Sequence, residues 1–152
     1  MPRLLVIAHA PSDNLRRLRD AVIAGASHPD IDIELICKAP LDADAEDVLA
    51  ADAILLGTPE NFAYMSGALK DWFDRIYYPC LELKQGLPYA LYIRAGNDGQ
   101  GAKNSIEKIV TGLRWKAVQP PLIMRGPFQE DFVARCEELG MTLAAGLEAG
   151  IY

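Results

Sequence analysis

The chain has 152 residues and a formal net charge of -6, and it contains 51% hydrophobic residues. This length predicts one domain, residues 1–152, whose core needs neither a disulfide nor a metal. The acidic balance argues against a nucleic-acid surface, and no apolar run approaches the ~20 residues of a membrane span. No signal peptide is recognisable, and Cys37, Cys80 and Cys136 are widely spaced. We therefore expect reduced thiols in a cytoplasmic protein.

The first elements are a strand and a helix joined by a polar loop. Leu4–Ala8 is an uninterrupted apolar run, which predicts a central strand covered on both faces. The first loop, His9–Asn14, follows it directly. Apolar residues then recur at helical spacing up to Gly25, and Ser12 is expected to cap the start of this helix.

The next two elements predict an edge of the sheet. Ile31–Cys37 alternates apolar and acidic residues, as a strand exposed on one side does. Asp42–Ala51 is expected to form a short acidic helix.

The most informative stretch is Ala53–Ile76. Its first residues, Ala53–Leu56, predict a central parallel strand that Gly57, Thr58 and Pro59 should end. From Ser66 onward, apolar residues at i, i+3, i+4 and i+7 predict a helix, which Tyr77-Tyr78-Pro79 should end. The second loop, Thr58–Ser66, is polar and aromatic and lies where open α/β sheets bind ligands.

The second half repeats the alternation of strand and helix. Tyr89–Ile93 predicts the fourth strand, and the third loop, Arg94–Gly101, contains three glycines that allow backbone to approach a ligand. A helix is expected from Ala102. Trp115–Met124 predicts a fifth strand, which the pair Pro120-Pro121 should bend or split at an edge of the sheet.

The last element is a helix expected over Glu130–Leu147. Five strands alternating with five helices predict a doubly wound α/β domain with a five-stranded parallel sheet. The edge character of the second and fifth strands favours the strand order 2-1-3-4-5 over 3-2-1-4-5. In that order the first, second and third loops meet at one edge of the sheet, and we predict the functional site there.

The segment G-T-P-E-N-F-A-Y-M-S-G-A-L-K-D-W-F-D, residues 57–74, resembles flavodoxin-like FMN proteins. P-x-x-F-x-x-M-S-G is similar to the NAD(P)H:quinone oxidoreductase branch, and the T-P-E start with G-x-L-K-x-x-x-D is similar to the NADPH-dependent FMN reductases. The resemblance implies the order 2-1-3-4-5, FMN as cofactor, NAD(P)H as reductant and a quinone or another small-molecule electron acceptor. It also allows a homo-oligomer.

The resemblance implies a role for each loop. The first loop would hold the FMN phosphate at a helix start, although Asp13 stands where the family has glycine and Pro11 lacks a donor. The second loop would stack on the isoalloxazine and hydrogen-bond to it, and the third would cover its pyrimidine edge. The implied cofactor-binding residues are His9, Pro11, Ser12, Asp13, Asn14, Thr58, Pro59, Glu60, Asn61, Phe62, Tyr64, Ala95, Gly96, Asn97, Asp98 and Gly99.

Several alternatives stay open. The domain could be an electron-transfer or interaction module with weak or lost flavin binding. Phe62 and Tyr64 could merely cap the core, and Glu60 could point to water. A P-loop is disfavoured because Lys103 lies one place late and Asn104 replaces the hydroxyl residue. No pattern identifies a catalytic acid or base or a metal site, and the choice between NADH and NADPH stays open.

Overall fold

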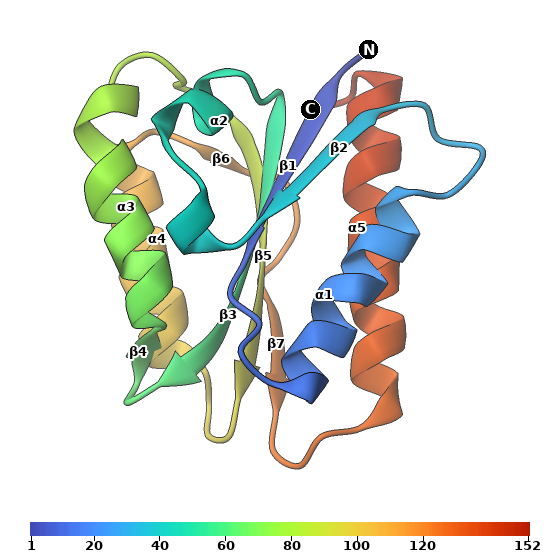
Figure 1. Cartoon of the computed structure of the whole chain (residues 1–152), viewed down its shortest axis with the longest axis vertical. Coiled ribbons are helices and arrows are strands. Elements are labelled where there is room, and N and C mark those ends of the chain that lie inside the picture. Colours follow the sequence, from blue (N-terminus) through green and yellow to red (C-terminus); the bar gives the residue numbers. More distant parts are fainter.

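The computed structural model describes residues 1–152 as a layered α/β arrangement (Figure 1). The strands are β1 (Arg3–Ala8), β2 (Glu34–Lys38), β3 (Ala53–Asn61), β4 (Tyr64–Met65), β5 (Pro88–Ala95), β6 (Lys116–Ala117) and β7 (Leu122–Arg125). The helices are α1 (Asp13–Ala26), the 3-10 turn η1 (Pro40–Asp42), α2 (Ala45–Leu49), α3 (Gly67–Cys80), α4 (Gln100–Gly112) and α5 (Glu130–Ala149).

The sheet has the predicted flavodoxin-like order. β2, β1, β3 and β5 lie side by side and parallel, and β5 pairs in parallel with β6 near its start and with β7 near its end. β6 and β7 are the two halves of the predicted fifth strand, separated at Pro120-Pro121 because proline supplies no ladder donor. The order 2-1-3-4-5 is therefore confirmed, with β4 as an addition that pairs only with β3.

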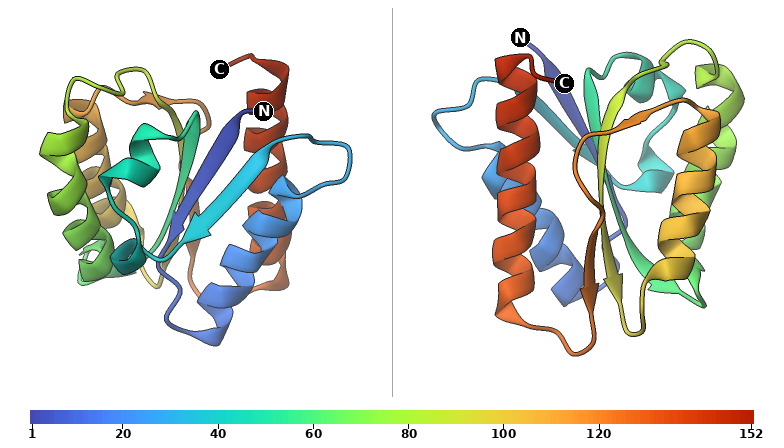
Figure 2. Two further views of the ribbon diagram at one scale, coloured as in Figure 1. Left: turned by 45° about the horizontal axis from the view of Figure 1, so that its top comes forward. Right: turned by 180° about the vertical axis from the view of Figure 1, so that it is seen from behind.

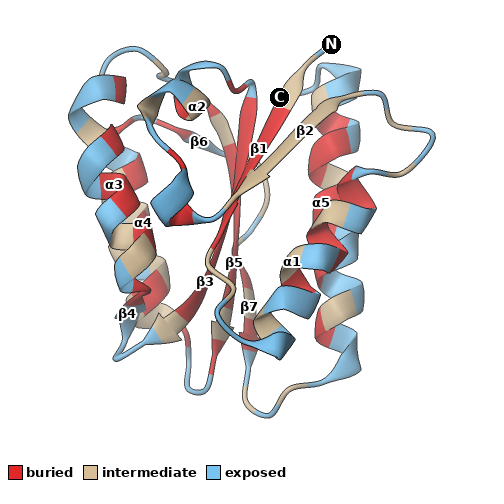
Figure 3. Ribbon diagram, viewed as in Figure 1, coloured by how far each residue is buried: buried red, intermediate tan, exposed pale blue.

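Helices cover both faces of the sheet, as Figure 2 shows. α1 and α5 pack on one face, while α2, α3 and α4 pack on the other. Successive strand residues alternate between these two cores, so Leu55 faces α1 and α5 whereas Ile54 and Leu56 face the opposite layer. Figure 3 shows the buried strands between helices whose outer faces are exposed.

Several predicted elements are confirmed. β1 begins one residue before the expected strand, and Ser12 caps α1 by accepting a hydrogen bond from the Leu15 amide at 3.3 Å. α5 begins at the predicted Glu130 and extends two residues further than expected, to Ala149. All three cysteines are free, as expected. Helices of this chain lack the combination of length and apolar character needed to cross a membrane.

The second strand and second helix differ from their predictions. β2 begins at Glu34 instead of Ile31, because its pairing with β1 starts at the Arg3–Glu34 pair. The expected helix over 42–51 shortens to η1 and α2. Asp44 caps α2, and this cap sets its start because the Asp44 carboxylate accepts from the amides of Glu46 and Asp47.

The third strand does not end at Gly57. Gly57, Thr58 and Pro59 continue the parallel ladder with β5, opposite Tyr92, Ile93 and Arg94. The missing donor of Pro59 is tolerated because β1 ends at Ala8, opposite Gly57, which leaves that side of β3 without a neighbouring strand. The predicted end of the strand at Gly57 was wrong because pairing with β5 outweighs the local tendency of glycine and proline to end a strand.

β3 then turns back as a β-hairpin that the sequence analysis did not predict. Asn61 pairs with Tyr64, and the two residues between them have positive φ, 52° for Phe62 and 59° for Ala63. This conformation is that of a two-residue type I′ turn, which usually contains Asn-Gly. α3 follows and continues through Pro79 to Cys80, past its predicted end, because a proline in the last turn disturbs few helical bonds.

Candidate functional site

Three loops gather at the edge of the sheet where the parallel strands end, at the bottom of Figure 1. The first loop follows β1, the second contains the β3–β4 hairpin, and the third joins β5 to α4. This edge is where open α/β sheets bind ligands. The structure therefore brings together the three loops that the sequence analysis selected.

The first loop offers backbone donors at the start of α1. The His9 amide is bound to the Gly57 carbonyl at 3.0 Å, which anchors the loop to β3. The amides of Ser12, Asp13 and Asn14 have no backbone acceptor, as expected for a helix start. Pro11 contributes no amide. Such free amides, together with the positive end of the helix dipole, suit an anion.

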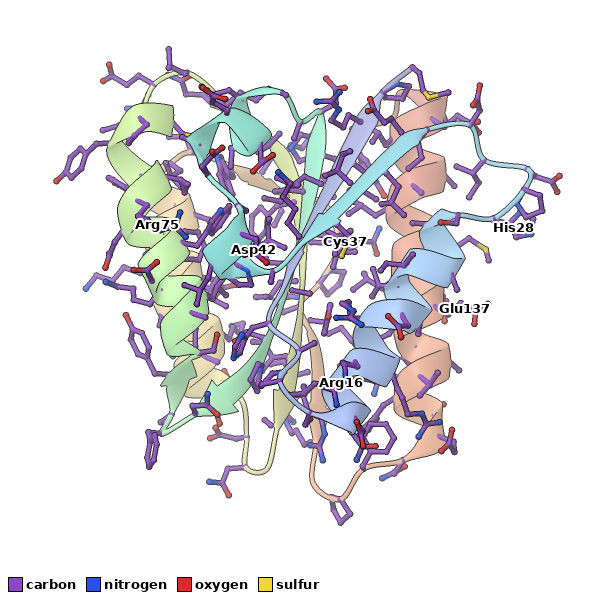
Figure 4. The ribbon with its side chains drawn as sticks, viewed as in Figure 1. Arg16, His28, Cys37, Asp42, Arg75 and Glu137 are labelled. Carbon is purple, nitrogen blue, oxygen red and sulfur yellow. The ribbon has the colours of Figure 1, made fainter.

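Arg16 balances the acidic residue at this helix start. The carboxylate of Asp13, whose side chain is 94% exposed, forms an ion pair with Arg16. Figure 4 shows Arg16 at the beginning of α1, close to the loop edge. In the next turn Arg17 forms an ion pair with Glu130 of α5. Asp13 is thus turned toward a cation and solvent, which lessens the repulsion an anion would meet.

The second loop presents its aromatic side chains to solvent. Phe62 is fully exposed at the hairpin tip, Tyr64 is 41% exposed, and Asn61 is exposed. The side chains of Phe62 and Tyr64 therefore do not cap the core. An exposed aromatic pair beside an open edge can stack on a planar ligand, with Asn61 as a hydrogen-bonding neighbour.

Two predicted residues of the second loop are engaged within the protein. The buried Thr58 hydroxyl accepts from the Ser66 amide at 3.0 Å and donates to the Pro59 carbonyl at 2.7 Å. The Glu60 carboxylate accepts from the Ala102 amide at 3.1 Å, at the start of α4. Both side chains thus make hydrogen bonds within the protein, and one oxygen of the Glu60 carboxylate faces the start of α4. Both fix the shape of the loop.

The third loop is held in place by hydrogen bonds on both sides. The Asp98 carboxylate accepts from the Gln100 amide at 3.0 Å, and its carbonyl accepts from the Arg125 side chain at 2.9 Å. Gly99 has φ 72°, a conformation that favours glycine. Gly96 and Asn97 are exposed, whereas Ala95 and Gly99 are buried. Gly96 and Asn97 are thus the members of this loop most accessible to a ligand.

The pockets of the molecule do not lie between the second and third loops. An open pocket of about 480 Å³ lies beside the first loop, where His9 and Pro11 face Arg19 of α1 and the end of β2. Partial burial there lowers the pKa of His9. Phe62, Tyr64, Gly96 and Asn97 are instead exposed on the surface of this edge, which would leave one face of a planar ligand accessible.

Arg94 is a residue of this edge to which the sequence analysis gave no role. Its half-buried guanidinium donates to the carbonyls of Ala95 at 2.6 Å and Met124 at 3.2 Å. It also lies over the rings of Phe128 and Phe132, 5.9 and 5.2 Å from their centres. The available signal was a charged residue that ends the apolar run Y-A-L-Y-I.

The residues present fit FMN at both of its ends. The free amides and positive helix end of α1 suit a phosphate. The exposed rings of Phe62 and Tyr64 suit the isoalloxazine, and Asn61 and Asn97 add polar contacts nearby. Pro11 and Asp13 weaken the phosphate end relative to a glycine-containing loop, but they do not occupy it.

Comparison with known proteins agrees with this geometry. The family model "NADPH-dependent FMN reductase" matches residues 14–129. No curated protein sequence is significantly similar to the chain.

Solved structures share the fold at low sequence identity. A flavodoxin from the domain Archaea is 18% identical, with a TM-score of 0.78 over 95% of this chain and 98% of that one. An apo NADH:FMN oxidoreductase is 14% identical, with a TM-score of 0.75 over 97% and 90%. An oxidoreductase from Corynebacterium diphtheriae is 18% identical, with a TM-score of 0.69 over 97% of each chain.

These neighbours establish a flavodoxin-like fold, and the family match extends over most of the chain and includes the second and third loops. The chain therefore belongs to the NADPH-dependent FMN reductase family, and FMN is its cofactor.

Proposed function

We propose that this protein is an NAD(P)H-dependent oxidoreductase that uses FMN to reduce a quinone or another small acceptor. The observation that carries the proposal is the exposure of Phe62 and Tyr64 of the second loop, and of Asn97 of the third loop, at the edge where the parallel strands end. Direct hydride transfer requires the nicotinamide to stack within reach of the flavin, so one flavin face must stay accessible. A small planar acceptor can use the same face after the nicotinamide leaves.

Each loop has a separate task in this proposal. The first loop holds the phosphate through the amides of Ser12, Asp13 and Asn14 and through the helix dipole. The hairpin presents Phe62 and Tyr64 for stacking, and the third loop presents Gly96 and Asn97 to the pyrimidine edge. FMN supplies the hydride and electron chemistry. The protein therefore needs no side chain that acts as acid or base.

The rigidity of the site supports a positioning role. The Thr58 hydroxyl joins the end of β3 to the start of α3, and Glu60 joins the hairpin to α4. Asp98 and Arg125 connect the third loop to the end of β7. A ring held between such fixed loops keeps its orientation toward a hydride donor, which lowers the entropy cost of the reaction.

The test is steady-state oxidation of NADPH and of NADH by the FMN-loaded protein, with and without a benzoquinone. We expect quinone-dependent oxidation of at least one nucleotide, and the apo protein without added flavin is the control. Because the edge is exposed, we expect several small quinones to act as electron acceptors. Oxidation that does not depend on the quinone or on bound FMN would refute the proposal.

A second candidate is an electron-transfer module with weak flavin binding. It is favoured by Pro11 and Asp13 in the first loop, and by similarity to flavodoxins over nearly the full length of both chains. Under this alternative the bound flavin exchanges electrons with a protein partner and reacts poorly with either nucleotide. A flavin that dithionite reduces and that neither NADH nor NADPH reduces would support it.

We further propose that residues 1–152 act as one domain in the cytoplasm and associate into a homo-oligomer. The single layered sheet and the three free cysteines support the first two points. The fully exposed Phe62 beside the open edge supports the third. Sedimentation at several protein concentrations, with and without FMN, tests the association. A monomer under all conditions would refute it.

A further inference from the structure

Arg94 carries a positive charge that the protein does not neutralise. It lies at the end of β5, and its guanidinium is bound by the carbonyls of Ala95 and Met124 through one nitrogen, Nη1. Its Nε and Nη2 groups make no hydrogen bond, and no carboxylate forms an ion pair with it. Partial burial lowers the pKa of Arg94, with no opposing contribution from a nearby acid.

The neighbouring Arg17 shows the contrast. Both guanidinium groups lie over the ring of Phe128, Arg17 at 5.3 Å and Arg94 at 5.9 Å from its centre. Arg17 is paired with Glu130, and this partner raises the pKa of Arg17. Two arginines therefore lie against one ring, and only Arg17 has a carboxylate partner. A half-buried cation without a counter-ion is costly unless an anion binds nearby.

The position of Arg94 indicates where such an anion would lie. Arg94 pairs with Pro59 of β3, and two residues earlier Gly57 pairs with Ala8, directly before the first loop. Its side chain packs against Phe128 and Phe132, on the sheet face that α1 and α5 cover. Through Phe128 it is a close neighbour of the second turn of α1. The uncompensated charge thus lies at the same sheet edge as the first loop.

We propose that Arg94 is a specificity-determining residue that makes this protein select FMN over riboflavin, by placing an unpaired guanidinium beside the phosphate end of the site. The inference rests on family membership and on the proposed function. In this inference Arg94 adds a charged contact to the FMN phosphate, which the first loop otherwise holds with backbone amides. Riboflavin lacks the phosphate, so it gains nothing from this charge.

The arrangement suits a phosphate dianion better than a neutral ligand. The two hydrogen bonds of Nη1 and the contacts with the rings of Phe128 and Phe132 hold the guanidinium in place. Its Nε and Nη2 groups remain as a pair of donors for phosphate oxygens. The low local polarity that depresses the Arg94 pKa also strengthens its attraction to an anion. Arg94 therefore compensates for Asp13 and for the missing amide of Pro11.

The experiment compares the dissociation constants of FMN and riboflavin for the wild type and for Arg94→Met, by flavin fluorescence quenching. Methionine keeps an unbranched side chain beside the two phenylalanine rings, so the variant should fold. Arg94→Lys restores a charge without the fork. Arg114→Met is the matched control, because it removes the same charge from the residue just after α4, at the opposite end of that helix.

We expect Arg94→Met to weaken FMN about tenfold and to leave riboflavin unchanged, whereas Arg94→Lys should recover part of the loss. Arg114→Met should change neither ligand. Equal weakening of FMN and riboflavin, or no change in either, would overturn the role of Arg94. If Arg94→Met does not fold, Arg94→Lys is compared with the wild type instead. Weaker binding of FMN alone supports the role of Arg94, and equal changes in the dissociation constants of FMN and riboflavin oppose it.

The same measurements separate this inference from the proposed function. A wild type that binds FMN and oxidises NADPH, with an FMN preference that Arg94→Met leaves intact, contradicts only the inference. A wild type that binds FMN selectively through Arg94, but whose flavin neither nucleotide reduces, contradicts only the proposed function.

Discussion

Gly101 lies directly against the carbonyl of Ala63, so closely that a β-carbon on Gly101 would be 1.8 Å from that oxygen. The tip of the β3–β4 hairpin therefore rests on the first turn of α4. Two hydrogen bonds reinforce this contact, from Ala102 to Glu60 at 3.1 Å and from Met65 to Ser105 at 3.4 Å. These contacts with α4 hold the second loop in place. Because α4 directly follows the third loop, the second and third loops form one structural unit.

Gly101→Ala should therefore damage both stability and flavin binding. The added methyl group collides with backbone, which must shift, and overpacking of this kind costs about 1–3 kcal/mol. We expect a lower free energy of unfolding in urea and weaker binding of FMN and riboflavin alike, because the hairpin moves. Gly67→Ala is the control. Gly67 begins α3 with open space around it, so this change should be neutral or slightly stabilising.

Phe62 should contribute to flavin binding at a cost to stability. Its ring is fully exposed and its φ is 52°, a region unfavourable to non-glycine residues by roughly 1–2 kcal/mol. We expect Phe62→Gly to raise the free energy of unfolding while it weakens FMN, since stacking contributes about 0.5–1.5 kcal/mol. Phe62→Ala should weaken FMN equally without the gain in stability. Unchanged dissociation constants in both variants would remove Phe62 from the site.

The sequence predicted which loops form this site, but it did not predict the conformation within each loop. Uninterrupted apolar runs such as Ala53–Leu56 depend on burial alone, so the central strands followed from them, and the edge character of the second and fifth strands then indicated the strand order. The hairpin did not, because Phe62-Ala63 is not the Asn-Gly pair typical of its turn. Glu60 and Arg94 were also beyond prediction. Their roles depend on partners far along the chain, Ala102 and Phe128, that only the folded sheet brings near.

Asp13 should weaken phosphate binding despite its ion pair with Arg16. We expect Asp13→Asn to tighten FMN several-fold, because it removes a like charge and releases Arg16. Riboflavin affinity should not change. Loss of an acidic residue from the first turn of α1 should cost about 0.3–1 kcal/mol of stability. Weaker FMN binding in the variant, or parallel changes for both flavins, would show that the phosphate lies away from the first loop.

His9 should make stability depend on pH. Burial lowers its pKa below the ordinary value of 6.5, so the unfolded chain binds a proton at a higher pH than the folded chain does. The free energy of unfolding should therefore fall as pH drops through 6.5, and the loss is complete below the folded pKa. His9 is only partly buried, so solvent screens the effect and we expect it to be on the order of a few tenths of a kcal/mol.

The comparison of wild type with His9→Asn by urea unfolding isolates this contribution. The variant should lose less stability than the wild type on acidification from neutral pH, since other titrating groups are common to both proteins. A variant with the same slope as the wild type would show that His9 titrates normally. Bound FMN should raise the pKa of His9 through its phosphate, and riboflavin should not, which NMR titration of the imidazole can measure.

The proposed function requires that FMN binds at this exposed edge and that a nicotinamide nucleotide reduces it there. The most direct measurement is the absorption spectrum of the FMN-loaded protein during anaerobic titration with NADPH and, separately, with NADH. We predict stoichiometric bleaching of the bound flavin by at least one nucleotide without any partner protein. A flavin that dithionite reduces and that neither nucleotide bleaches would contradict the account.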